Sequence, residues 1–111
     1  MQIMSKNTIE INDFLERHKL EIKSLIEEFD LNIEFSSHDF IEKFIVKFES
    51  DYIEMLVKYQ KSGQAFRKVH GMMARFLSLN MSNLRIVKTL RKGSENVRGK
   101  IDNIKWWMRI N

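Results

Sequence analysis

The fold is decided by residues 41–59, which read IEKFIVKFESDYIEMLVKY. Apolar side chains recur there at alternating steps of four and three residues, the spacing that places them on one stripe of a helix. The stripe consists of Ile41, Ile45, Phe48, Tyr52, Met55 and Tyr59. Ser36 and Asp39 form a capping-box pattern before it, and Gly63 follows it as a stop signal. The pattern therefore predicts a helix at about 38–61.

An earlier segment repeats this spacing and predicts another helix at about 8–30. Its stripe consists of Ile11, Leu15, His18, Ile22, Leu25 and Phe29. We expect Thr8 to be the N-cap of this helix and the polar His18 to lie in the seam between the two helices. Because the linker is short, the two helices should return antiparallel as an acidic helical hairpin spanning residues 8–61.

Further apolar side chains exceed what one seam between two helices can cover. They are Phe14, Ile26, Phe40 and Phe44. They must pack on the C-terminal half, on a second copy of the chain or on a partner, and we treat them as a candidate interaction face. A homodimer through the helical hairpin is one form of this hypothesis.

Charge is divided unevenly along the chain. Residues 1–60 carry 7 Lys and Arg against 13 Asp and Glu, a net charge of −6, whereas residues 61–111 carry 12 against 2, a net charge of +10. A concentrated positive field attracts DNA or RNA over a Debye length of roughly 10 Å. Alternatively, the basic half docks on the acidic hairpin. The excess of positive over negative charge favours a nucleic-acid partner, DNA before RNA.

The sequence pattern of the basic half, residues 62–111, predicts a helix-turn-helix-like unit. Residues 64–80 have the apolar spacing of a helix, residues 80–83 favour a turn, and residues 84–92 would form a short basic recognition helix. The candidate nucleic-acid contacts are the basic side chains of this half. They are Arg67, Lys68, Arg75, Arg85, Lys88, Arg91, Lys92, Arg98, Lys100, Lys105 and Arg109.

The C-terminal segment is ambiguous. Two glycines within residues 93–99 indicate an exposed loop, and residues 100–111 fit either a strand or a helix. A strand pairing with residues 86–90 would make a small β wing, but we favour a helix because strand partners are scarce. Of the adjacent Trp106 and Trp107, we expect one to anchor the segment to the core and the other to be partly exposed, with base stacking as the alternative.

No catalytic or metal-binding motif is present in the sequence. Cysteine is absent, and His18, His38 and His70 are isolated, although His38 and Glu42 share a helical face. Phosphate-binding glycine loops and nucleophile elbows are also absent. We therefore expect no enzyme activity, no metal and no cofactor. The lack of cysteine and of long apolar runs predicts a cytoplasmic protein that does not enter a membrane.

Together these patterns predict one mainly α domain over residues 1–111, with a helical hairpin packed on a helix-turn-helix-like unit. The expected function is a small, non-enzymatic nucleic-acid-binding protein with a regulatory or accessory role. The alternative is a helical protein-interaction or structural module that assembles through the aromatic face of the hairpin.

Overall fold

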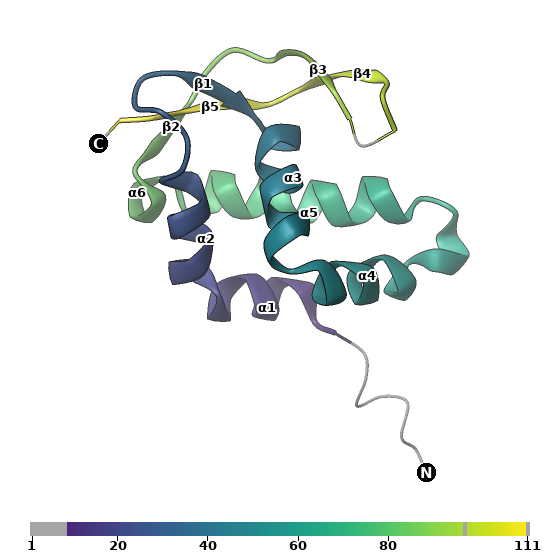
Figure 1. Ribbon diagram of the computed structural model, residues 1–111. Coiled ribbons are helices and arrows are strands. Elements are labelled where there is room, and N and C mark those ends of the chain that lie inside the picture. Colours follow the sequence, from purple (N-terminus) through teal and green to yellow (C-terminus); the bar gives the residue numbers. More distant parts are fainter. Residues whose placement is uncertain (1–8, 97, 111) are drawn as a thin grey trace.

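The computed structural model describes residues 9–96 and 98–110, except for the side chain of Asp102, and shows a mainly helical protein with small antiparallel sheets (Figure 1). The helices are α1 (Ile11–Arg17), α2 (Lys19–Ile26), α3 (Ser37–Lys47), α4 (Glu49–Lys58), the 3-10 helix η2 (Gln60–Ser62), α5 (Ala65–Leu79) and α6 (Met81–Leu84). The strands are β1 (Glu34–Ser36), β2 (Ile86–Lys88), β3 (Lys92–Glu95), β4 (Ile101–Ile104) and β5 (Trp106–Arg109). In Figure 1 the strands lie together above the helices.

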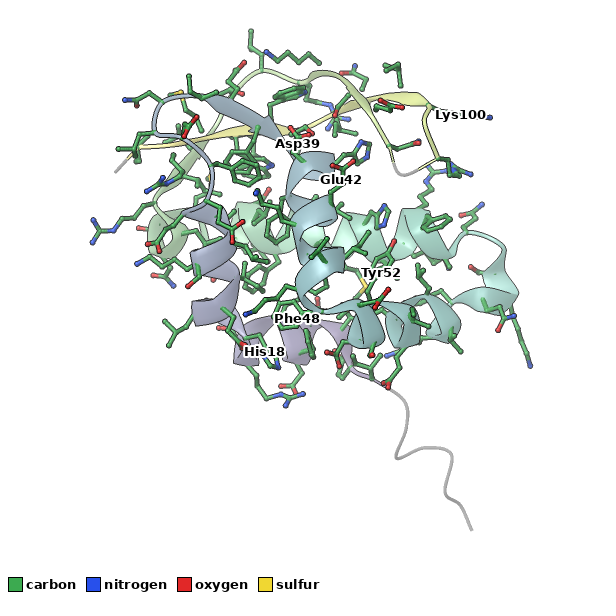
Figure 2. The ribbon with its side chains drawn as sticks, viewed as in Figure 1. His18, Asp39, Glu42, Phe48, Tyr52 and Lys100 are labelled. Atoms are coloured by element: carbon green, nitrogen blue, oxygen red, sulfur yellow. The ribbon has the colours of Figure 1, made fainter. Side chains whose placement is uncertain are left out.

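Each predicted N-terminal helix is in fact a pair of helices joined at a bend. The bend between α1 and α2 lies at His18, and the bend between α3 and α4 lies at Phe48. The two bends meet, because the His18 and Phe48 rings are 5.3 Å apart (Figure 2). On either side of the bends, α1, α3 and α4 all contact α5. The prediction of one continuous helix at 8–30 and another at 38–61 was therefore wrong.

The bends leave no trace in the apolar spacing, because the stripe faces the core on both sides of each bend. Gly63 ends this part of the chain with the left-handed φ of 73° that its position after η2 requires. Thr8, the expected N-cap, lies outside the described residues. The side chain of Glu10 caps α1 by accepting hydrogen bonds from the backbone N–H groups of Asn12 and Asp13.

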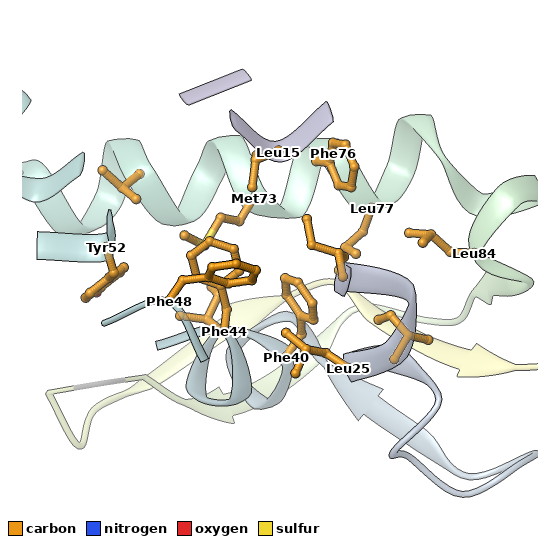
Figure 3. Packing of buried hydrophobic residues seen from close by; sticks show 14 of the residues in the cluster. Leu15, Leu25, Phe40, Phe44, Phe48, Tyr52, Met73, Phe76, Leu77 and Leu84 are labelled. Carbon is orange, nitrogen blue, oxygen red and sulfur yellow. The ribbon is translucent and has the colours of Figure 1, made fainter. Parts of the chain in front are cut away.

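The aromatic residues of the first half belong to the core. The four proposed for an interaction face, Phe14, Ile26, Phe40 and Phe44, are 4%, 0%, 1% and 0% exposed. Figure 3 shows Phe40 and Phe44 packed together with Met73 and Leu77 of α5. All four belong to the core cluster that also contains Met73 and Leu77 of the C-terminal half, so packing within the chain covers them. An exposed interaction face at these positions is therefore excluded.

The basic half contains one of the two expected helices. The predicted helix at 64–80 is confirmed as α5, whereas residues 84–92 are not helical. α6 ends at Leu84, and Arg85 adopts a left-handed φ of 57° before strand β2 begins. The β-branched Ile86 is buried there and pairs with Arg109, which stabilises a strand rather than a helix. The recognition helix, and with it the helix-turn-helix, was a wrong prediction.

The C-terminal segment is a pair of strands, so our preference for a helix at 100–111 was also wrong. β5 is the central strand of the sheet β1-β5-β2, and the predicted strand alternative is confirmed by the pairing of Val87 with Met108. The third strand, β1, lies in the linker between α2 and α3 and pairs Phe35 with Trp107. Because β1 belongs to the first half of the chain, it was not considered as a partner for the C-terminal segment. With β1 and β2 on either side, β5 has two neighbouring strands instead of one.

Strands β3 and β4 form a two-stranded ribbon that extends away from the three-stranded sheet (Figure 1). The loop predicted at 93–99 is therefore shorter than expected, because residues up to Glu95 belong to β3. At the turn, the side-chain oxygen of Asn96 accepts hydrogen bonds from the backbone N–H groups of Arg98 and Lys100.

In the described part of the chain, none of the helices has the length and apolar character needed to cross a bilayer.

Candidate functional site

The first turn of α3 is fixed against the strands. The predicted capping box is confirmed, with the Asp39 N–H donating to the Ser36 hydroxyl at 3.0 Å and the Ser36 N–H donating to the Asp39 carboxylate at 2.9 Å. The backbone N–H and the hydroxyl of Ser37 both donate to the Lys105 carbonyl, at 3.1 and 3.2 Å. The buried indole N–H of Trp107 donates to the Ser37 hydroxyl at 3.1 Å. The start of α3 therefore holds a set position beside the β4–β5 junction.

A pocket of about 610 Å³ lies between this first turn, one face of α5 and the ribbon. Its lining residues from α3 and α5 are Ser37, His38, Ile41, Phe66, Arg67, His70, Gly71 and Ala74. Those from the strands and their connections are Arg91, Asn96, Arg98, Asn103, Ile104 and Lys105. Among these described lining residues, four are cations and none is an Asp or Glu. The described residues of the wall therefore produce a positive field with no carboxylate among them to offset it.

The wall contributed by α5 follows from helical spacing. Arg67, His70, Gly71 and Ala74 lie at steps of three, one and three residues, which places them on one face of the helix. A Cβ atom built on Gly71 would have no heavy atom within 4 Å, so this wall opens directly into the pocket. The opposite face of α5 points into the core.

The ribbon brings distant cations to the same place. The Arg91 guanidinium donates to the Asn103 carbonyl at 2.6 Å across the ribbon, while the turn at Asn96 places Arg98 at the pocket. The pKa of Lys105 is lowered by burial first, and then by the positive charges of Lys88, Arg91 and Arg75. A hydrogen bond of 3.3 Å joins its ammonium to the Ser78 hydroxyl.

These contacts define a cluster that we call the basic face. It consists of the four pocket cations and the two others that act on Lys105: Arg67, Arg75, Lys88, Arg91, Arg98 and Lys105. All six are among the residues predicted from the sequence as nucleic-acid contacts. The helix on which two of them, Lys88 and Arg91, were expected does not form, and strand β2 and the β2–β3 connection supply these two instead.

The other five predicted contacts lie elsewhere or have other partners. Lys92 forms an ion pair with Glu34 and lies over the Trp106 ring, at 4.6 Å, and the ammonium holds the pKa of Glu34 below its usual range. The Arg109 guanidinium donates to two carbonyl oxygens of the α2–β1 linker. Lys68 lies over the Tyr59 ring, at 5.6 Å. Arg85 is at the end of α6, and Lys100 points away from the ribbon turn (Figure 2).

Two histidines in the wall were not predicted as site residues. His70 is buried, and its Nε2 lies 2.7 Å from the Tyr52 hydroxyl. Burial, and then the charges of His38 and Arg98, lower the pKa of His70 to about 4, while burial raises the pKa of Tyr52 to about 12. At neutral pH both groups are therefore uncharged. The sequence signal for His70 was its helical spacing from Arg67, and this spacing is too common to identify a pocket.

Most of the ion pairs among the described residues lie within the first half of the chain. Within residues 9–96 and 98–110, five of the six ion pairs join residues of the first half to each other. In this described part of the chain, the pair between Lys92 and Glu34 alone connects the two halves. Among the described residues, the basic half therefore packs on the acidic half through α5 but forms one ion pair with it.

Trp106 and Trp107 follow the expected division. Trp107 is fully buried, whereas Trp106 is partly exposed and donates from Nε1 to the Lys92 carbonyl at 3.0 Å. Across the described side chains, no group of three or more His, Cys, Asp or Glu is arranged to hold a metal ion.

The fold and the pocket define a mainly helical protein with small antiparallel sheets and a basic pocket where helices and strands meet. Comparisons with models of protein families, with curated proteins and with solved structures find no match to this chain. Its function therefore has to follow from the residues themselves.

Proposed function

We propose that this protein binds nucleic acid through the basic face, without catalysing a reaction. The observation that supports it is the convergence of six cations, four of them lining a pocket that has no Asp or Glu among its described lining residues. Phosphate groups are the polyanionic partners that such a cluster of Arg and Lys binds in water. A regulatory or accessory role in the cytoplasm belongs to the same proposal.

A recognition helix would have favoured duplex DNA, but the residues predicted to form it, 84–92, are not helical. Contacts from the basic face would go mainly to phosphates, and such contacts position a protein without selecting a base sequence. We therefore propose nucleic acid as the partner class, with duplex DNA tested first and single-stranded RNA second.

Salt dependence tests the proposal. If about five phosphates are neutralised, the logarithm of affinity falls against the logarithm of salt concentration with a slope near −4.5 for a duplex and near −3.5 for a single strand. Fluorescence anisotropy of labelled duplex DNA and single-stranded RNA at several salt concentrations measures this slope. Absence of binding at low salt would overturn the proposal and leave an acidic protein surface as the partner to seek.

Matched variants then test the location of the site. Replacing Arg67, Arg75 and Lys88 by alanine removes three charges from the basic face, and replacing Lys68, Arg85 and Lys100 removes three charges outside it. We expect the first triple variant to reduce affinity at least about tenfold and the duplex slope by about 2.7, because each lost phosphate contact contributes about 0.9. The second should stay within about threefold of the parent. Equal losses in both would show that net charge acts without a site.

A further inference from the structure

The pocket is a hollow, and binding to the phosphates along a nucleic-acid backbone does not require a hollow. Contacts to an internal phosphodiester need only exposed cations, whereas a hollow of about 610 Å³ lies within the roughly 300–1,000 Å³ range of sites that enclose a small ligand or group. Its positive residues come from three separate parts of the chain, namely α5, the β2–β3 connection and the ribbon with its junction to β5. They therefore surround the hollow instead of lying along a line.

His38 adds a polar group that needs a partner. It lies in the first turn of α3, lines the pocket and is 6% exposed. Its Nδ1 atom is buried and has no hydrogen-bond partner among the described residues. Buried polar atoms are nearly always paired, so this nitrogen is a candidate to bond a ligand in the pocket.

Phe66 adds an aromatic surface beside these charges. Its side chain lines the pocket while remaining 38% exposed, and its ring is 5.6 Å from the ring of His70. A partly exposed aromatic ring next to cations suits the stacking of an unpaired base. The pocket thus combines a place for a concentrated negative charge with a place for the attached nucleoside.

We propose that the pocket binds the phosphate monoester at the end of a nucleic-acid strand. This inference rests on the proposed nucleic-acid function and adds the part of the ligand that enters the pocket. A terminal monoester carries about −1.5 to −2 charges at pH 7, whereas an internal diester carries −1, so the convergent cations favour the former. A strand end can also enter a hollow end-on, whereas an internal phosphate is tethered on both sides.

Oligonucleotides that differ only at their ends test this inference. The probes are one labelled single strand with a 5′-phosphate, the same strand with a 5′-hydroxyl, and the same strand with a 3′-phosphate. We expect a phosphorylated end to bind about tenfold more tightly than the hydroxyl-ended strand in anisotropy titrations. Equal affinity of all three strands would overturn the inference but leave the proposed function standing. If none of them binds at low salt, the proposed function fails as well.

Gly71 offers a variant that fills the pocket without disturbing the core. Because a Cβ there meets no heavy atom within 4 Å, Gly71→Gln should place a neutral side chain in the hollow, and Gly71→Ala is the matched control. We expect Gly71→Gln to abolish the tenfold preference, measured as the ratio of its affinities for the phosphorylated and the hydroxyl-ended strand. Gly71→Ala should keep the preference. A preference that persists in folded Gly71→Gln would place the phosphate elsewhere and overturn the inference.

Competition separates a strand end from a small phosphorylated molecule. Adenosine monophosphate, inorganic phosphate and adenosine are each titrated against the bound 5′-phosphorylated strand. Displacement by millimolar adenosine monophosphate but not by adenosine would support recognition of a monoester. If adenosine monophosphate binds as tightly as the strand, the pocket is a site for a small phosphorylated molecule, and the strand-end inference fails.

Discussion

His70 should make the protein markedly less stable in mild acid. Its pKa is about 4 in the folded chain, against an ordinary value of about 6.5 in the unfolded chain. Between these two pH values the unfolded state binds one more proton than the folded state, so the free energy of unfolding falls as the pH falls. The loss reaches about 3 kcal/mol by pH 4, because each unit of difference in pKa corresponds to about 1.4 kcal/mol.

Urea denaturation measures this effect at a series of pH values from 7 to 4, with tryptophan fluorescence as the signal. Carboxylates titrate in the same range, so the informative quantity is the difference between the parent and the His70→Gln variant. We expect the parent to lose about 3 kcal/mol more than the variant between pH 7 and pH 4. If the free energy of unfolding falls equally with pH in the two proteins, the reasoning is refuted. An NMR titration that finds the His70 ring of the folded protein already protonated at pH 5.5 would refute it directly.

Three further substitutions test other parts of the structure, each by urea or thermal denaturation. Ser37→Ala should destabilise the protein by about 2–3 kcal/mol, because the buried Trp107 N–H loses its acceptor; a change below about 0.5 kcal/mol would contradict this hydrogen bond. Phe44→Ala should cost about 3–5 kcal/mol as a core truncation, whereas a residue on an exposed interaction face would show little change. His38→Leu should raise stability by about 1 kcal/mol by removing the unpaired Nδ1, and should lose the preference for phosphorylated strand ends; a destabilised variant would show that the nitrogen is satisfied in solution.

Local features could be predicted because their causes lie close together in the sequence. The α5 helix follows from apolar spacing over four turns, and the capping box at Ser36 and Asp39 needs only residues three apart. The division of roles between Trp106 and Trp107 was expected for such an adjacent pair, although we expected it in a helix and the structure has a strand there. The six cations of the basic face were all among the predicted contacts, since charge segregation is a property of composition.

Features that depend on distant residues could not be predicted in this way. The bends at His18 and Phe48 arise where two rings from different helix pairs meet, and the apolar stripe has the same period on both sides of each bend. The strand at residues 106–109 needs β1, whose three residues look like part of a linker. Neither contact has a local signature.

The sequence by itself determined that the chain is mainly helical, that its first half is acidic and its second half basic, and where several helices begin or end. Helical period, capping and charge act over a few residues and can be seen in one dimension. Only the tertiary structure decided that Arg67, Arg98 and Lys105 share a pocket and that His38 lies beside them. Packing of β5 between β1 and β2 brings these residues together, and such packing depends on contacts between segments far apart in the chain.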